Sequence, residues 1–428
     1  MPKLRKLRFA VRASLVVLLA AASSPAVQTL GTDDNHIKIG GLLQAWAVSQ
    51  EDGAPNHGTE TDFYVRRIRL MLFGKVSQRV SFFIDTDSPN LGKGGDWSGR
   101  MFIQDAYVEY EAHEALQIAG GMLLLPFSHH GMQGATTLLG VDYHAALLRY
   151  PHASNLVWRD AGLMVRGMPF GSVLEYRVGL FNGIRGNTKP ESKTATTEDG
   201  TDLAWREPTD PRNPSDAPRV TARLTLNLFD PEGGPGVAGM FYDGIYLEPR
   251  PEGLVSPKTV VAFGGSVDWQ KDANVTWDAI PATGVRGVAE RSDYLAAAGD
   301  VFWDIPVGPE KIMSVNGQIN FFAFDHGARG LGSVSYYDGV PAASRLYSGW
   351  GVAAEAGFRY DIVQPIVRYD RFTASDTEGD LGAYQAVAGG INAWLSGHTA
   401  SLKMQIGAET EHGGKWLANG TLQAQLMF

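Results

Sequence analysis

The sequence predicts an all-β fold, a transmembrane antiparallel β-barrel of 16 strands. Hydrophobicity alternates with period two in segments of about ten to fourteen residues, and Gly (51 residues) and Pro (22 residues) fall largely between them. No stretch approaches 18 uninterrupted apolar residues after the N-terminal region. A tilted strand needs about 9–11 residues to cross hydrocarbon, so alternation of this length is typical of a membrane-spanning barrel.

The alternation is clearest in residues 219–229, 313–322, 399–409 and 421–428. A soluble β-sandwich also alternates, so three further features decide between the two folds. The polar faces carry full charges such as Arg223 and Lys403, aromatic residues cluster near the strand ends, and the last alternating segment ends on an aromatic residue. Aromatic girdles at both interfaces are typical of outer-membrane barrels, and together these features favour the barrel.

The gaps between the alternating segments are short and long in turn, as periplasmic turns and external loops are in such barrels. With both chain ends in the periplasm, the number of strands must be even. Within residues 237–257, Gly239 to Leu247 could form one more strand, but a total of 17 would break the even number. A barrel of 18 strands would need a second missed strand, so we treat residues 237–257 as irregular. Long gaps lie near 49–61, 88–100, 125–158, 184–217, 271–292 and 325–346. The 16 strands are predicted to begin near Ile37, Asp62, Gln78, Met101, Ala115, Asp160, Ser172, Arg219, Lys258, Asp293, Lys311, Tyr347, Ile362, Leu381, His398 and Lys415.

The N-terminal residues predict export. Basic residues between Lys3 and Arg12 precede an apolar run from Leu15 to Ala22 and small residues up to Ala26. This pattern predicts a signal peptide over residues 1–26, and the run is too short to span roughly 30 Å of hydrocarbon as a helix. Residues 27–428 are then one barrel domain, expected in the outer membrane of a Gram-negative bacterium.

Composition narrows the class of partner. The chain has no cysteine, so no disulfide framework holds it together. Its net charge is -9, and residues 1–26 carry basic but no acidic residues, so the mature chain is more acidic still. This acidity argues against a nucleic-acid partner. The expected partners are outer-membrane lipid and small anionic or neutral solutes.

Several motifs, in order, resemble those of one porin family. They are FYVRRIRL at residues 63–70, DAYV at 105–108, GGMLLLPF at 120–127, PRVTARLTL at 218–226 and VRYD at 367–370. The sequence resembles the phosphate-selective porin O and P family, most strongly over residues 37–185. The resemblance implies a 16-stranded homotrimeric barrel whose third loop folds inward, with pore-lining arginines and with loop lysines that help to select phosphate. The matching arginines are Arg66, Arg67, Arg69, Arg219 and Arg223.

A closed barrel satisfies its backbone hydrogen bonds within lipid, and at about 16 strands its interior holds an aqueous channel whose lining charges set selectivity. Each lining arginine could instead pair with an acid and brace the wall, as Arg177 could with Glu175; for the set we expect a net preference for anions. Because Arg66 and Arg67 are neighbours, one of them is expected to point outward or lie at the interface. The predicted basic lining residues are Arg66, Arg67, Arg69, Arg79, Arg177, Arg219, Arg223, Arg359, Arg368 and Lys403, and the acidic ones are Asp105, Glu175, Asp268, Asp300, Glu355 and Glu409.

Residues 125–158 form the predicted constriction loop, and the absence of lysine from it departs from the family's phosphate selectors. The spacing of its four histidines matches no zinc signature, so neither a metal nor another cofactor is expected. Histidines with an ordinary pKa of about 6.5 would strengthen anion preference in mild acid. The residues expected to act in this loop are His129, His130, Asp142, Tyr143, His144, Arg149, Tyr150 and His152.

The leading functional hypothesis is a passive channel that favours anions, phosphate among them. One alternative is a non-selective or sugar-preferring porin, in which Phe127, Tyr143, Tyr150 and Trp158 would stack against sugar rings. A second alternative is a non-conducting structural barrel or an outer-membrane enzyme. The sequence shows no HExxH motif, no Gly-rich phosphate loop and no supported Ser/His/Asp group, so no enzymatic activity is expected.

Overall fold

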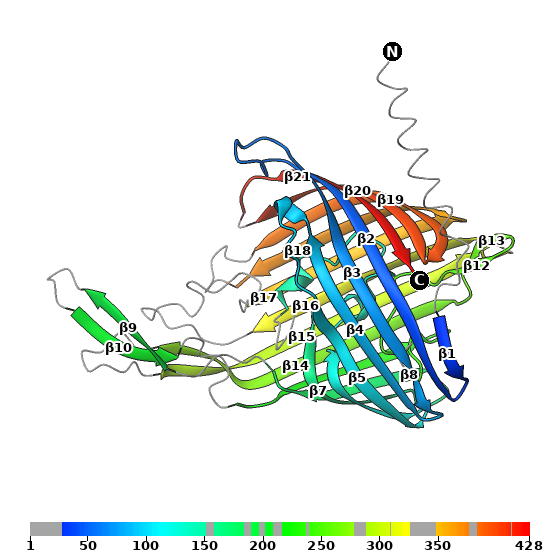
Figure 1. Cartoon of the computed structure of the whole chain (residues 1–428), viewed down its shortest axis with the longest axis horizontal. Helices are drawn as coiled ribbons and strands as arrows, with labels where there is room; N and C mark the ends of the chain where they lie inside the picture. The colour runs from blue at the N-terminus through cyan, green and yellow to red at the C-terminus, as the bar shows by residue number, and fades with distance from the viewer. Residues whose placement is uncertain are drawn as a thin grey trace, which may run out of the picture.

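Sixteen antiparallel strands close into a barrel in the computed structural model (Figure 1). The structure describes residues 28–428 except 151–157, 184–189, 197–201, 209–215, 237–238, 278–287, 309, 326–347, 376–382 and 412. The wall strands are β2 (Asn35–Gln50), β3 (Glu60–Ser77), β4 (Val80–Leu91), β5 (Phe102–His113), β6 (Leu116–Leu124), β7 (Arg159–Gly167), β8 (Leu174–Phe181), β11 (Arg219–Asn227), β14 (Val260–Trp277), β15 (Val288–Val307), β16 (Met313–Asp325), β17 (Gly349–Tyr360), β18 (Val363–Ala374), β19 (Tyr384–His398), β20 (Ala400–Glu411) and β21 (Leu417–Met427).

The barrel closes between its first and last wall strands. β2 pairs with β3 along one edge and with β21 along the other, from Leu42 opposite Met427 to Gln50 opposite Asn419. The short strand β1 (Gln28–Thr32) pairs with the part of β2 that β21 leaves free. Every other wall strand pairs with its neighbours in the chain, and β8 pairs with β11. The sixteen wall strands therefore form a closed cylinder.

The predicted strand count is confirmed. Each wall strand begins within three residues of its predicted position, except β15, which begins five residues earlier than predicted. The segment that left 18 strands open adds no wall strand. Within it, β12 (Glu248–Arg250) and β13 (Gly253–Val255) form only a short hairpin. In the external loop after β8, β9 (Pro190–Thr196) and β10 (Asp202–Pro208) form a second hairpin outside the wall (Figure 1).

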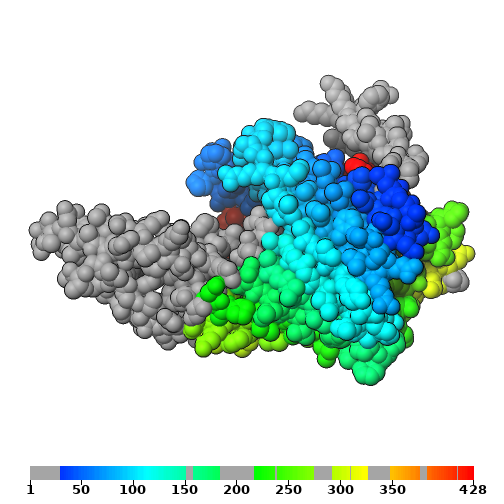
Figure 2. All heavy atoms as spheres, turned by 60° about the horizontal axis from the view of Figure 1, so that its bottom comes forward, coloured from blue at the N-terminus to red at the C-terminus, as the bar shows by residue number. Residues whose placement is uncertain are grey.

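The two faces of the wall have opposite character, as the alternation predicts. In β11, Val220, Leu224 and Leu226 are exposed, while the residues of the opposite face are buried, namely Arg219, Thr221, Arg223, Thr225 and Asn227. Figure 2 shows the outer face over the N-terminal strands, coloured from blue to green. No helix among the described residues is long and apolar enough to span a membrane. Exposed apolar side chains on the outer face include Ile39, Leu43, Leu72, Ile84, Val108, Ile118, Leu163, Val178, Leu180, Val267, Val315, Phe321, Val367, Ile391, Met404 and Leu422.

Two segments enter the lumen. The constriction loop (125–158) connects β6 and β7 and contains the 3-10 turns η2 (His130–Met132) and η3 (Leu147–Arg149). The second, here called the inward segment (228–259), connects β11 and β14 at the rim where the short turns lie. Backbone hydrogen bonds join the two: Tyr242 N–H donates to Met132 O (2.9 Å), and Gly134 N–H donates to Tyr242 O (3.2 Å).

The lumen therefore contains a hydrophobic core, which was not predicted. Tyr143, Tyr150 and Trp158 of the constriction loop pack in one cluster with Met240 and Tyr242 of the inward segment. Wall residues Phe83, Tyr107, Phe322 and Phe324 complete this cluster. This packing fixes both segments inside the barrel, so any open passage must lie between them and the wall.

Candidate functional site

A β-bulge in β3 directs two consecutive arginines into the lumen. Gln44 pairs with Arg67 and Ala45 pairs with Val65, so Arg66 is the extra residue. A bulge places two residues of one strand opposite one residue of its partner, which breaks the strict alternation. The expectation that Arg66 or Arg67 points outward is therefore wrong, because both contact Asp142 of the constriction loop.

Both arginines hold the Asp142 carboxylate. Arg66 Nη2 lies 2.8 Å from Oδ2, and Arg67 Nη2 lies 2.6 Å from Oδ1. Burial alone would raise the pKa of Asp142, but the two guanidinium groups outweigh burial and lower it below its usual value. Arg67 also donates to Gln44 Oε1 (2.9 Å), and Arg66 lies over the Trp46 ring at 5.2 Å. Two positive charges thus share one carboxylate at this point of the lumen.

Polar side chains of the wall hold the next part of the loop, residues 134–142, against β19, β20, β21 and β2. Lys403 donates to the carbonyls of Leu138 and Gly140, the latter at 3.2 Å. A Cβ atom on Gly140 would lie 2.3 Å from Arg368 Nη1, so glycine allows this close approach. The remaining donors are Gln44 to Ala135 O (3.2 Å), Gln425 to Thr136 O (3.0 Å) and Asn392 to Leu139 O (2.9 Å).

On the wall from β3 to β15, the lumen arginines that the structure describes are paired with carboxylates. Arg177 pairs with Glu175 at 2.6 Å and also donates to the carbonyls of Gly239 and Met240, both at 2.8 Å. These arginines therefore brace the lumen segments, as the alternative hypothesis expected. The other pairs are Arg69 with Asp85 and Asp87 (3.0 Å each), Arg159 with Asp105 (3.1 Å), Arg166 with Glu109 (2.7 Å), Arg223 with Asp300 (2.7 Å), and Arg219 with Asp268.

The other predicted charged residues lie in different places. Arg359 is buried at the short-turn rim, where it donates to Ser256 Oγ (2.6 Å) and to Leu254 O (3.0 Å). Glu409 accepts a hydrogen bond from the Tyr384 hydroxyl (2.7 Å).

One residue that was predicted to line the pore does not join the lumen wall. Arg79 is exposed in the turn between β3 and β4, because β3 ends at Ser77, so its assignment to the pore lining is wrong. In the constriction loop, Arg149 is placed over the Tyr384 ring at 4.7 Å, whereas His152 lies outside the described residues.

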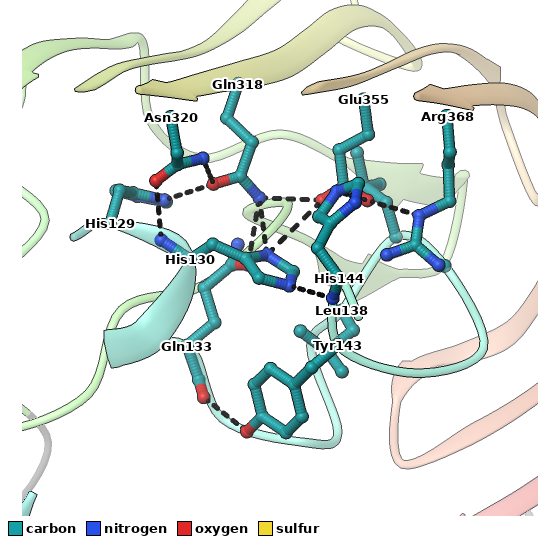
Figure 3. A network of polar contacts seen from close by, with 12 residues as sticks. His129, His130, Gln133, Leu138, Tyr143, His144, Gln318, Asn320, Glu355 and Arg368 are labelled. Carbon is teal, nitrogen blue, oxygen red and sulfur yellow. Dashed lines mark hydrogen bonds and ion pairs between the residues drawn. The ribbon is translucent and has the colours of Figure 1, made fainter. Parts of the chain in front are cut away.

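Three histidines of the constriction loop lie in one polar network (Figure 3). The His129 amide donates to Asp300 (3.0 Å), and its ring lies 2.7 Å from Glu232 Oε1 of the inward segment. His130 Nε2 accepts a hydrogen bond from the His144 amide (2.9 Å). The ring of His144 lies between two carboxylates, 2.9 Å from Asp370 Oδ1 and 3.4 Å from Glu355 Oε2. Arg368 Nε is 3.1 Å from the same Glu355 oxygen.

The pKa values of two of these histidines move in opposite directions, contrary to the expectation that all would titrate normally. Burial, aided by the charge of His144, lowers the pKa of His130 well below 6.5. Burial and Arg368 also lower the pKa of His144, but Asp370 and Glu355 outweigh them and raise it. Of these two histidines, His144 is therefore the more easily protonated, and its contacts with Glu355 and Asp370 anchor the loop to β17 and β18.

The same cluster was tested as a metal site. Ligand atoms of His130, His144 and Glu355 lie within 4.8 Å of one another among the described residues. However, one ring nitrogen of His130 accepts the His144 amide, and the other faces the Gln318 side-chain amide at 3.1 Å. The Arg368 guanidinium already occupies one side of Glu355. The donors and charges present suit an ion-pair network better than a divalent cation.

Two cavities flank the constriction loop. The outer cavity, of about 220 Å³, is lined by Asp142, Tyr143 and Arg368 together with β19 and β20. The inner cavity, of about 470 Å³, lies against β2, β3 and β4 and is bounded by loop residues 134–137 and by the inward segment. The strip of loop held by Gln44, Lys403 and Gln425 separates them. A permeating solute would pass this strip.

Sequence reasoning missed several lumen charges and the inward segment. Asp85 and Asp87 follow the alternation of β4, and Glu109 that of β5, so the pattern could have identified them. The inward segment has no such signal. Other missed charges on the lumen face include Arg159, Arg166, Asp304 and Asp370.

A closed antiparallel barrel with an apolar outer face, a polar lumen and a loop folded inside is the architecture of porins of the Gram-negative outer membrane. Residues 37–204 match the family described as phosphate-selective porin O and P. The resemblance inferred from the sequence is thereby confirmed. Among curated proteins, none matches the chain significantly.

Solved structures share the fold at low sequence identity. OmpF of Salmonella typhi, in a complex with daunomycin, has a TM-score of 0.55 at 8% identity, covering 94% of this chain and 100% of that one. An anion-selective porin from Comamonas acidovorans has a TM-score of 0.52 at 9% identity, with coverages of 92% and 99%. The outer-membrane channel DcaP of Acinetobacter baumannii has a TM-score of 0.50 at 13% identity, with coverages of 92% and 97%.

Proposed function

We propose that the protein is a passive diffusion channel for small hydrophilic solutes and that it prefers anions. The observation that carries this proposal is the closed barrel with cavities on both sides of an inward-folded loop. At 16 strands, the lumen is too wide for wall side chains alone to fill, and the loop narrows it. The solute passes between the loop and the wall, where charged side chains act at short range.

The preference for anions is supported by the charges beside the narrow strip. Arg66 and Arg67 share a single carboxylate there, and Lys403 donates to two backbone carbonyls and forms no ion pair with any residue that the structure describes. The Comamonas porin, which shares the fold, is itself described as anion-selective. Phosphate is a natural candidate within this class, given the family match. Because the loop contains no lysine, we propose small anions in general, with phosphate among them.

The sugar-preferring alternative is not favoured by the aromatic side chains that suggested it. Phe127 stacks on Tyr150 with ring centroids 4.2 Å apart, and Tyr143 meets Trp158 edge-on at 4.8 Å. All four rings are buried. They pack the loop into the lumen and leave no open ring face for a sugar.

Two further expectations are part of the proposal. The signal peptide, residues 1–26, lies outside the described residues, and N-terminal sequencing of the mature protein would test the cleavage after Ala26. The homotrimer implied by the family is tested by the mass of the detergent-solubilised protein in light scattering.

The decisive experiment is conductance in planar bilayers. We expect discrete channel steps, a reversal potential in a KCl gradient with the sign of an anion-preferring pore, and a lower chloride current when phosphate is added. A cation-preferring sign would overturn the anion preference. Folded protein that gives no steps would favour a non-conducting barrel, consistent with the contact between its two lumen segments.

A further inference from the structure

The inner cavity has a lining that conduction of small inorganic ions does not require. Wall residues Met71, Phe73 and Phe83 face it, as does Phe241 of the inward segment. The Phe83 ring lies 6.2 Å from Phe73 and 5.6 Å from Phe241, so the rings form a continuous aromatic surface. The lumen of a porin is ordinarily polar, because its lining contacts water. Its volume, about 470 Å³, falls in the range of small-molecule sites.

Positive charge lies beside this aromatic surface. Lys38 and Lys75 line the cavity, and neither forms an ion pair with any residue that the structure describes. Lys38 pairs with Phe73 across β2 and β3, so Lys75 is its diagonal neighbour on the same face, about 7–8 Å away between Cα atoms. At this separation both ammonium groups can reach one carboxylate.

The acidic side chains of the lining form no ion pair with Lys38 or Lys75 in the part of the chain that the structure describes. Arg69 is paired with the lining carboxylate Asp85, and Arg159 is paired with a carboxylate of β5. The remaining lining acid is Asp243, and burial raises its pKa, which weakens its negative charge. His36 at the start of β2 also lines the cavity.

The position of the cavity indicates the side from which it fills. Lys75 lies near the end of β3 and His36 near the start of β2, both at the rim of the short turns. Pro235 and Gly236 of the inward segment complete the lining. The short-turn rim is periplasmic, so a ligand reaches this cavity from the periplasmic side without passing the constriction loop.

We propose that the inner cavity is a binding site for aromatic carboxylates, with Lys38 and Lys75 holding the carboxylate and Phe73, Phe83, Phe241 and Met71 contacting the ring. An anion without an apolar part would contact only the two lysines, and a neutral aromatic molecule would contact only the aromatic surface. The two features together select molecules that carry both. The inference rests on the cavity and does not depend on the ion preference proposed above.

The test uses 2-naphthoate, which is fluorescent, with acetate and 2-naphthylmethanol as partial ligands. Binding to the detergent-solubilised protein is measured by fluorescence anisotropy at low salt, and acetate and the alcohol are tested as competitors. We expect saturable binding of naphthoate, with neither competitor displacing it at equal concentration. In bilayers, periplasmic naphthoate should block current at lower concentration than external naphthoate.

The variant K38Q/K75Q removes the charges, and both side chains are at least partly exposed, so folding is expected to persist. We expect its dissociation constant to rise about fivefold or more, the effect of losing roughly 1 kcal/mol. The matched control, K93Q/R100Q, removes two positive charges from the external loop after β4 and should bind as the parent does. M71Q replaces an apolar side chain that contacts the aromatic ring of the ligand, and it should also weaken naphthoate binding.

Two results would overturn the proposal: naphthoate displaced by acetate at equal concentration, or equal affinity in K38Q/K75Q and the parent. Because anisotropy does not require conduction, a protein that binds naphthoate but passes no current would contradict the proposed channel and leave this site standing. A protein that conducts but binds no naphthoate would do the reverse.

Discussion

Asp142 is the carboxylate whose removal should change ion preference most directly. Asp142→Asn keeps the shape of the side chain but removes the negative charge that Arg66 and Arg67 share. Both guanidinium groups then act on passing ions without a counter-charge. The loop also loses its attachment to β3, while its contacts with Lys403 and Gln425 remain.

The size of the effect follows from Coulomb's law. An ion that passes about 4–8 Å from the lost charge, in water, gains or loses about 0.5–1 kcal/mol. The change has opposite sign for anions and cations, so the ratio of their permeabilities changes by about 1–2 kcal/mol, or about five- to thirtyfold. Screening shortens this range, so the effect should decrease as salt rises above about 0.1 M.

The assay is the reversal potential of single channels in a KCl gradient at two ionic strengths. Asp142→Asn should increase anion preference, more so at low salt. Asp96→Asn, in the exposed external loop where Asp96 contacts Ser98, is the matched control and should leave the reversal potential unchanged. An unchanged reversal potential in Asp142→Asn, or a shift towards cations, would refute the placement of Asp142 beside the passage.

Three further changes test other parts of the structure. Leu224→Arg puts a charge on the outer face, so the free energy of unfolding into denaturant from vesicles should fall by about 2–4 kcal/mol; an unchanged value would contradict the lipid-facing assignment. Because Asp370 and Glu355 raise the pKa of His144, its anchoring is present below about pH 6.5 and is lost as pH rises through the higher folded value. Current noise should therefore increase above that value in the parent channel, and His144→Gln should be noisy at every pH. Arg177→Gln removes donors to two carbonyls of the inward segment, so proteolysis of that segment from the periplasmic side should become faster; an unchanged rate would show that Arg177 does not hold it.

The wall could be predicted from sequence because each strand has a local two-residue alternation that does not depend on the rest of the chain. In residues 219–229, every second residue is apolar, and the wall consists of sixteen such local patterns joined by short turns and longer loops. Shifting a strand by one residue would exchange its apolar and polar faces, so the alternation determines which side chains of each strand face lipid. The same reasoning failed at Arg66, since a bulge shifts the period by one and leaves no mark in the local sequence.

The contents of the lumen could not be predicted in this way. GMFYDGIYL at residues 239–247 resembles a strand because apolar and polar residues alternate there, yet Met240, Tyr242 and Ile245 are buried inside the barrel. They are buried against the constriction loop, which lies far earlier in the chain. The hydrogen bond from the Thr137 hydroxyl to Tyr242 O, for example, joins residues 105 positions apart. Likewise, alternation placed Arg223 on the lumen face but could not show that Asp300 neutralises it.

The central claim is that successive side chains of one strand face lipid and lumen in turn, and cysteine scanning tests it most directly. The chain has no cysteine, so each introduced residue from Ser314 to Phe321 in β16 carries a single spin label. The account predicts that accessibility to oxygen in the bilayer has period two, with its maxima at Val315, Gly317, Ile319 and Phe321. A period near 3.6, or uniform accessibility to a water-soluble relaxing agent, would contradict it.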